Sequence, residues 1–482
     1  MPRCKTVGSL YSKSFRVVQC LLWNCADNLD RENAVQNRSS LVFQINSYIT
    51  ENLPAEILED LMERQEGTSH MYFMFLLRPD CRKFKAKNIM LPSSYWETIF
   101  ATYFQNLVML NLSLSCTDYI LQFVPRYCPN LEVLNATCRY ERMRVGLNAA
   151  AFSLSVTDAG LEHLCECKKL RVLVVNEPRS QSRFMQTSIT YCGLRKILRC
   201  VKTLENITYS DLGSVIGKGM ETVDSLNLRI VRHFNGTGET VGEILRLCSK
   251  LENLSLTFFN NTSHEDVLQQ IEMFKPRLTG LQITNFNCNP FIETLFGAVG
   301  EFLQVLHIAE HRNALRFPQL VAIGRLCPNL KHLTILNYND DRRQVGPPPA
   351  FNQFTCLESF ELACTAINFT HVMFFCLRNA QHTLQSLTIT HRDHDRITFI
   401  DEFFLKNFTF HNISEITFSS CYRFSQSGIE QLILRYETLQ LLNVYCPDDC
   451  SDIHNFIRTN NLDVIFINKL HQMLDSRELN FN

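Results

Sequence analysis

One pattern of three apolar positions recurs along most of the chain. The template is Leu330-x-x-Leu333-x-Ile335, and each match has similar apolar residues at the same three positions. The matches start at thirteen places: Leu107, Leu131, Leu170, Leu204, Val223, Leu251, Leu278, Leu303, Leu330, Leu357, Leu384, Ile413 and Leu439. Successive starts from Leu278 onward lie 25, 27, 27, 27, 29 and 26 residues apart, and the earlier spacing is less regular. Such self-similarity predicts a repeat architecture rather than several ordinary domains.

Polar and apolar residues alternate within each match. The third position holds a residue suited to a protein interior, with Ala136 and Tyr209 the least typical. The residue before it is polar in every match but one: Asn111, Asn135, Val174, Thr208, Asn227, Ser255, Gln282, His307, Thr334, Glu361, Thr388, Thr417 and Asn443. Because successive side chains of a strand point to opposite faces, this alternation predicts strands with one buried and one exposed face.

Helical patterns lie between the predicted strands. Their apolar residues recur on one helical face: Leu320, Ile323 and Leu326 in one segment, and Val241, Ile244, Leu245 and Cys248 in another. One strand–loop–helix unit cannot cover its own apolar face, so neighbouring units must stack. The predicted fold is an α/β solenoid with parallel strands on the concave face and helices on the convex face.

Composition limits the classes of partner. The formal net charge is -1, with 47 basic and 48 acidic residues and no long block of either sign, so little field attracts a nucleic acid or a membrane. Hydrophobic residues make up 45% of the chain, which suits a packed core. No stretch approaches the roughly 20 apolar residues that cross a bilayer, and no signal peptide is recognised. We expect no nucleic-acid or membrane partner and a location in the cytoplasm, the nucleus or both.

Searches for metal and catalytic motifs give no candidate site. Twenty cysteines in a long chain with no recognised leader favour reduced thiols over a disulfide framework. The close pairs Cys165/Cys167 and Cys446/Cys450 are not followed by a second pair at zinc-ligand spacing. The phosphate-loop, nucleophile-elbow, His-Glu-x-x-His and dinucleotide motifs are absent. We therefore expect a non-catalytic binding protein with no cofactor and no metal.

Two Cys-Pro-Asn-Leu runs, at 128–131 and 327–330, and the segment SVTDAGLEHLCECKKLRVL at 155–173 carry a family resemblance. They resemble the cysteine-containing leucine-rich repeats of the substrate receptors of cullin-RING ubiquitin ligases. The resemblance covers residues 84–447 as about 13 repeats and leaves 448–482 as a C-terminal cap. It implies that the repeats bind a target protein, which other subunits mark with ubiquitin for degradation.

Residues 1–83 have a different, helical pattern. Apolar residues share one face of the segment 51–65: Leu53, Ile57, Leu58, Leu61 and Met62. One interpretation is a cap over the first repeat, because the ends of a solenoid need covering. In the other, Leu53-Pro54-Ala55-Glu56-Ile57-Leu58 resembles the opening of an F-box, which binds a Skp1-type adaptor and cullin-1. The later Val-Cys and Trp positions of that family have no counterpart in this segment.

The N-terminal region also resembles the boxes that bind an elongin-C-type adaptor and cullin-2. Two segments fit the Ser/Thr-Leu start of such a box, one at Ser9-Leu10 and one at Ser40-Leu41, with Ser14 and Ile45 in place of the usual cysteine. Leu53-Pro54 would then open the cullin box. Taken together, the resemblances imply these adaptor-binding residues: Leu10, Leu41, Leu53, Pro54, Ile57, Leu58 and Leu61.

The polar positions of the predicted strands and the loops that follow them are the candidate target-binding residues. Aromatic and arginine side chains are enriched at protein interfaces, and three of these loops contain them. The candidates are Gln282, His307, His311, Arg312, Thr334, Tyr338, Glu361, Thr388, His391, Arg392 and Tyr445. The leading hypothesis is a ligase substrate receptor with an unknown target. The alternatives are a free-standing interaction scaffold or inhibitor, in which residues 1–83 are only a cap, and a secreted receptor fragment.

Overall fold

The structure, a computed structural model, divides into two compact units. It describes residues 7–31, 38–63, 70–85, 93–113, 115–137, 156–175, 189–209, 211–217, 219–220, 223–234, 236–259, 263–286, 288–309, 315–338, 353–364, 370–391, 398–399, 401–418, 422–444, 446, 451–460 and 462–468. The N-terminal unit comprises Val7–Phe234 and Arg246–Leu251, and the C-terminal unit comprises Asn235–Leu245 and Glu252–Asn482. Among the described residues, no helix is long and apolar enough to cross a membrane.

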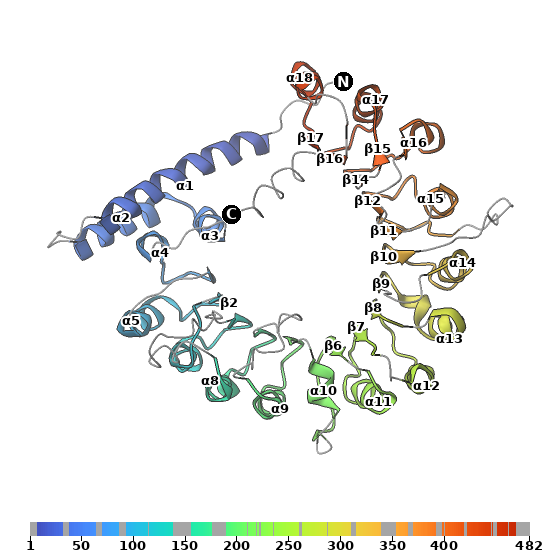
Figure 1. The fold of residues 1–482 in the computed structure, drawn as a ribbon. Coiled ribbons are helices and arrows are strands. Elements are labelled where there is room, and N and C mark those ends of the chain that lie inside the picture. The colour runs from blue at the N-terminus through green and yellow to red at the C-terminus, as the bar shows by residue number, and fades with distance from the viewer. Residues whose placement is uncertain are drawn as a thin grey trace, which may run out of the picture. The chain divides into compact units, whose positions relative to one another are not determined.

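The N-terminal unit starts with four helices and continues as strand–helix repeats (Figure 1). The first helices are α1 (Val7–Arg31), α2 (Arg38–Asn52), α3 (Ala55–Glu63) and α4 (His70–Leu76). Six parallel strands follow in chain order: β1 (Lys83–Lys85), β2 (Met109–Asn111), β3 (Val133–Asn135), β4 (Val172–Val174), β5 (Asn206–Thr208) and β6 (Ile230–Phe234). The helical elements between them are α5 (Ser93–Tyr103), α6 (Asp118–Leu121), α7 (Val124–Tyr127), α8 (Asp158–His163), η2 (Leu164–Glu166), α9 (Tyr191–Cys200) and α10 (Leu212–Ile216).

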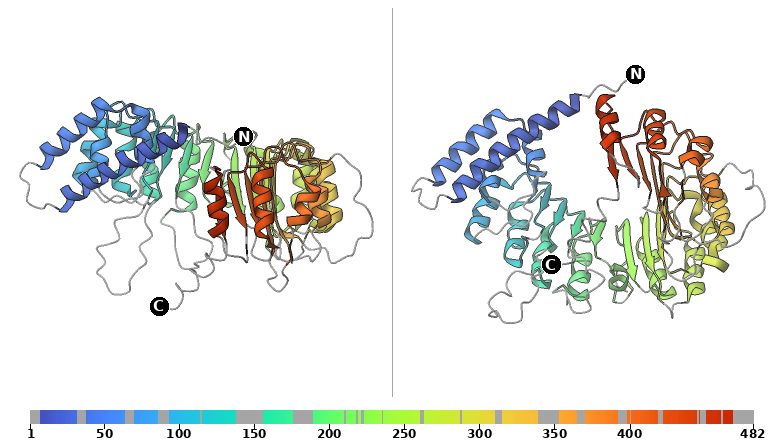
Figure 2. Two further views of the ribbon diagram at one scale, coloured as in Figure 1. Left: turned by 90° about the horizontal axis from the view of Figure 1, so that it is seen from above. Right: turned by 45° about the horizontal axis from the view of Figure 1, so that its top comes forward.

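The C-terminal unit is a more regular stack. Its parallel strands are β7 (Asn253–Thr257), β8 (Gly280–Thr284), β9 (Val305–Ala309), β10 (His332–Tyr338), β11 (Ser359–Cys364), β12 (Ser386–His391), β14 (Glu415–Phe418), β16 (Leu441–Val444) and β17 (Ile465–Asn468). Its helices are α11 (Gly238–Leu247), α12 (His264–Phe274), α13 (Cys288–Val299), η3 (Gly300–Phe302), α14 (Phe317–Leu326), α15 (Thr370–Leu377), α16 (Asp401–Asn407), α17 (Gln426–Arg435) and α18 (Ser451–Thr459). A small separate sheet pairs β13 (Thr398–Phe399) with β15 (Tyr422–Arg423). Helices line one face of the strands in the views of Figures 1 and 2.

The apolar positions of the repeat form buried rows in the C-terminal unit. Leu254, Leu281, Leu306 and Leu333 are register partners on four adjacent strands, and each is at most 2% exposed. Burying one such side chain contributes about 1.5–3 kcal/mol, so each added repeat strengthens the same core. The predicted α/β solenoid with parallel strands is confirmed, and twelve of the thirteen predicted matches lie at the observed strands.

The predicted match at Val223 is wrong. Strand β6 pairs with β5 so that Ile230 lies opposite Asn206, which starts the repeat at Leu228, five residues later. The third position of the pattern then falls on His233, a polar side chain that is only 2% exposed. A search for three apolar residues therefore misses this repeat.

Burial of His233 is compensated by a hydrogen-bond network. Its Nδ1 lies 3.0 Å from Asp211 Oδ1, and Asp211 Oδ2 accepts a hydrogen bond from the Tyr191 hydroxyl at 2.9 Å. Burial raises the pKa of Asp211, but hydrogen bonds from His233, Ser214 and Tyr191 outweigh it and hold the pKa below its ordinary value. A buried polar side chain is tolerated here because it is paired.

In the N-terminal unit, one hydrogen-bond pattern joins the starts of consecutive helices. Asp118 accepts hydrogen bonds from the backbone nitrogen and the hydroxyl of Thr157 at 2.8 and 2.6 Å. One repeat later, Asp158 accepts the same two bonds from Thr190 at 2.8 and 2.5 Å. Both threonines also cap the helices that follow them, α8 and α9. A Cβ atom on Gly193 would lie 2.2 Å from Asp158 Oδ1, so glycine permits this close approach.

Candidate binding surfaces

Polar residues form a row across the strands of the C-terminal unit. The row, which we call the ladder face, consists of Ser255, Gln282, His307, Thr334, Glu361, Thr388, Thr417 and Asn443, each opposite the next in register. All are exposed or half-buried, while the buried leucine row alternates with them. Five predicted target-binding residues, Gln282, His307, Thr334, Glu361 and Thr388, therefore lie side by side.

Two contacts define the chemistry of the ladder face at its centre. Thr334 Oγ1 donates to Glu361 Oε2 at 3.3 Å, across neighbouring strands. Burial lowers the pKa of His307, and the nearby Glu361 opposes this only in part, so the imidazole is neutral at pH 7. The centre of the ladder face thus offers a carboxylate, a hydroxyl and a neutral ring, all of which can form hydrogen bonds with a protein partner.

Sequence reasoning missed a second exposed row on the same face. It lies two residues before the ladder face and includes Val305, His332, Ser359, Ser386 and Glu415, again in register. Val305 is 43% exposed, and Ser386 Oγ donates to Glu415 Oε2 at 3.5 Å. The alternation that identified the ladder face would have found this row too, because a strand repeats its facing every two residues.

The predicted rim residues have mixed outcomes. Tyr338 ends β10 and is fully buried, so its ring belongs to the core; we correct its assignment to the exposed rim. His391 ends β12 opposite Cys364, but its side chain lies outside the described part. The remaining rim candidates, His311, Arg312, Arg392 and Tyr445, also lie outside the described residues.

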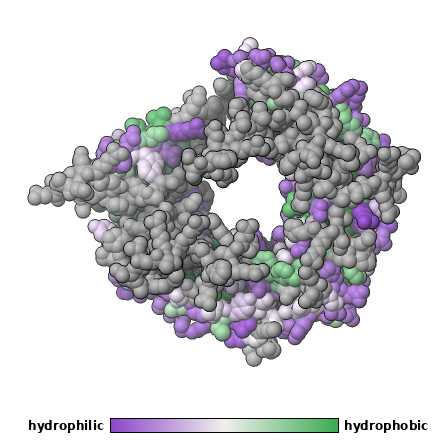
Figure 3. Space-filling model, viewed as in Figure 1, coloured by the Kyte–Doolittle hydropathy of each residue, from purple (hydrophilic) through white to green (hydrophobic). Residues whose placement is uncertain are grey.

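Helices α1 and α2 expose large apolar side chains. Val17 and Leu21 on α1 are each 60% exposed, and Leu41, Phe43 and Tyr48 on α2 are 39%, 65% and 70% exposed. We call these five residues the helical patch. Both helices pack against α4, and hydrophobic residues reach the surface over α1 in Figure 3. Large exposed apolar side chains on two helices that pack against a common helix are candidates for an interaction site.

The predicted adaptor-binding residues divide into exposed and buried groups. Leu58 and Leu61 on α3 are 2% and 0% exposed, so they are core residues and not a free docking face. Ile57 and Leu53 are half-buried, and Pro54 is exposed. Leu41 belongs to the helical patch, and Leu10 lies in α1 with its side chain outside the described part.

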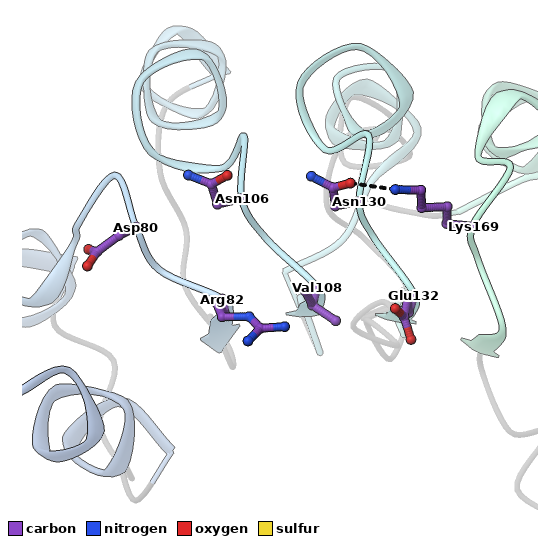
Figure 4. A pocket seen from close by; sticks show the side chains of 7 residues that line it. All are labelled: Asp80, Arg82, Asn106, Val108, Asn130, Glu132 and Lys169. Atoms are coloured by element: carbon purple, nitrogen blue, oxygen red, sulfur yellow. Dashed lines mark hydrogen bonds between the residues drawn. The ribbon is translucent and has the colours of Figure 1, made fainter.

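An open hollow of about 420 Å³ lies where β1, β2 and β3 begin (Figure 4). Its lining residues are Asp80, Arg82, Asn106, Val108, Asn130, Glu132 and Lys169. Lys169 Nζ donates to Asn130 Oδ1 at 2.7 Å, and Glu132 pairs with Arg171 at 3.3 Å. The charges are of both signs, and both acidic residues form ion pairs, Asp80 with Arg78 and Glu132 with Arg171, so the hollow does not select an anion or a cation. Across the described residues, no group of three or more His, Cys, Asp or Glu side chains is arranged to hold a metal.

Comparisons with known proteins give a likeness among solved structures only. Neither the protein-family models nor the curated proteins give a match. Among solved structures, a chain in the crystal structure of the Rad7 and Elc1 complex from yeast is 12% identical, with a TM-score of 0.45. The likeness covers 98% of this chain and 100% of that chain. A likeness at this level does not carry a function from one protein to another.

Proposed function

We propose that this protein is the substrate-recognition subunit of a cullin-RING ubiquitin ligase and catalyses no reaction itself. The helical patch binds an adaptor, and the ladder face holds a target protein. The observation that carries the proposal is the exposure of five large apolar side chains on α1 and α2, since a helix that only caps a core turns such residues inward. Ubiquitin transfer belongs to other subunits, and this chain contributes proximity. We expect it to act in the cytoplasm, the nucleus or both.

An elongin-C-type adaptor is favoured over a Skp1-type adaptor. The apolar side chains of the F-box-like segment, Leu58 and Leu61, are occupied within the core. The leucine of the second elongin-type box, Leu41, is 39% exposed, and Phe43 on the same helix is 65% exposed. An apolar pocket on an adaptor gains free energy only from side chains that are still in contact with water.

The adaptor proposal is tested by mixing the purified full-length protein with purified elongin C and, separately, with Skp1. Replacing Leu41→Asp together with Phe43→Asp places two charges in the helical patch. We expect elongin C to bind the wild type and to lose about tenfold or more in affinity for the variant, because burying an unpaired carboxylate is costly. Isothermal titration calorimetry measures the affinity.

The matched control is Leu434→Asp with Ile465→Asp, two side chains that are 60% and 64% exposed in the C-terminal unit. This control should bind elongin C as the wild type does, and circular dichroism should show both variants folded. Equal binding by all three proteins would reject the helical patch as the docking site. Binding to neither adaptor would reject the ligase proposal itself.

The second candidate function is a free-standing interaction scaffold or inhibitor. Burial of Leu58, Leu61 and Met62 on α3 favours this second function, because the buried face of α3 is what a helix that covers the end of a solenoid presents. In that case the ladder face still binds a protein partner, but neither adaptor associates. The titrations with elongin C and Skp1 therefore separate the two functions.

A further inference from the structure

Two cysteines from neighbouring repeats meet in the N-terminal unit. Cys165 lies in η2, and Cys200 is the last residue of α9. These two elements pack against each other, and Cys200 lies close enough to Cys165 to help raise its pKa. Cys165 Sγ also lies 3.9 Å from the Leu161 carbonyl oxygen. Two thiols close together on adjacent, packed elements are the starting arrangement for a disulfide.

The surroundings of the pair suit reaction with a dissolved molecule. Cys200 is exposed and Cys165 is half-buried. Lys196, one helical turn before Cys200, interacts with both sulfur atoms and forms an ion pair with Glu162. The thiolate is the nucleophile in disulfide exchange. Lys196 lowers the pKa of Cys165, but burial outweighs it, so the exposed Cys200 is the thiol that reacts first.

We infer that Cys165 and Cys200 form a reversible disulfide by exchange with a small-molecule disulfide such as oxidised glutathione. This modification site is independent of the proposed ligase function. Its closure links two repeats on their helical side, between residues that are 35 positions apart in sequence.

The exchange takes two steps. The Cys200 thiolate attacks one sulfur of oxidised glutathione, the glutathione S–S bond breaks, and one glutathione thiolate leaves and takes up a proton. The Cys165 thiol then loses its proton, and its sulfur attacks Cys200 Sγ and displaces the second glutathione. Two protein thiols are oxidised to one disulfide, and one oxidised glutathione is reduced to two glutathione thiols.

Other cysteines provide internal comparisons. Cys128 and Cys167 also interact with each other, but both are buried, so an oxidant in solution does not reach them. Cys192 lies on α9 with Cys200 and is exposed, and no contact to a second thiol is recorded for it among the described residues. Access and a neighbouring thiol occur together at Cys165 and Cys200.

The full-length protein is incubated with excess oxidised glutathione, quenched with acid and analysed by peptide mass spectrometry. We expect a Cys165–Cys200 cross-link that dithiothreitol reverses, with little glutathione retained on Cys200. In Cys165→Ser, glutathione should remain attached to Cys200. The matched control Cys192→Ser should form the cross-link at the wild-type rate.

The pH dependence adds a readout that random oxidation does not share. Burial is the main cause that raises the pKa of Cys165, to about 12. The thiolate fraction of Cys165, and with it the rate of the second step, should rise about tenfold per pH unit between pH 7 and 9. A stable glutathione adduct on Cys200 in the wild type, or a cross-link through another cysteine, would overturn the inference.

Discussion

Gly297 and Gly300 lie three residues apart where α13 passes into η3, but their surroundings differ. A Cβ atom on Gly300 would lie 2.4 Å from the Leu326 carbonyl oxygen and 3.0 Å from Cys327 Sγ, whereas one on Gly297 would meet nothing within 4 Å. Gly300→Ala should therefore lower the free energy of unfolding by about 1–3 kcal/mol, because backbone atoms must shift. Gly297→Ala should leave it unchanged or raise it by about 0.5–1 kcal/mol. Urea denaturation measures both, and equal effects would contradict the close approach at Gly300.

At the scale of single residues, the sequence predicts which side chains face outward on a strand but not what covers a helix. Gln282, His307 and Thr334 lie where the alternation of the strands placed them. Leu58 and Leu61 do form one apolar face of α3, as the pattern indicated. That face is buried, with α4 as one neighbouring element, and a periodic pattern does not reveal which element packs on it.

At the scale of elements, the contact between α8 and α9 depends on a shared carboxylate. Thr190 caps α9 and donates its hydroxyl to Asp158, the first residue of α8. Thr190→Val should lower the free energy of unfolding by about 1–2 kcal/mol, as expected for the loss of a cap. Asp158→Ala should lower it as well.

Because these two side chains act together, their effects should not add. The double variant should be less destabilised than the sum of the single variants, by about 0.5 kcal/mol or more. A double-mutant cycle followed by urea denaturation checks this coupling. Additive losses would show that the two helix starts are stabilised separately.

The sequence predicted some elements more accurately than others. Strands of the C-terminal unit follow from the regular 27-residue spacing, whereas β6 was misplaced because buried His233 breaks the apolar pattern. The sequence of helix α2 did not predict which face is buried, because its apolar residues Leu41, Val42, Phe43 and Ile45 lie on different sides of the helix. The helical patch therefore became visible only with the structure.

At the scale of the whole molecule, stability should depend on acid through Asp211. Its pKa is held below the ordinary value in the folded protein, so its contribution is present above the unfolded pKa of about 3.9 and is lost as the pH falls through the folded pKa. Asp211→Asn should unfold more easily than the wild type at pH 6, and this difference should shrink below about pH 4. Urea denaturation at pH 6, 4 and 3 provides the comparison. A difference that does not change with pH would exclude an ionised Asp211 as its source.

The order of the strands could be predicted for the molecule, because stacked repeats place consecutive strands side by side. The division into two compact units could not. It falls inside the predicted repeats, between Phe234 and Asn235, because spatial contacts define it and the repeat pattern continues past this point.

The ladder face separates the residues that meet a partner from the residues that form the core. Each repeat supplies one side chain to the row, with neighbouring strands, and so neighbouring members of the row, about 4.8 Å apart, and the opposite side of the same strand supplies the core. Exchanging Gln282 or Glu361 would alter what a partner meets without disturbing Leu281 or Phe360 beside them. New specificities can therefore arise one repeat at a time, through single exchanges that leave the folding of the chain intact.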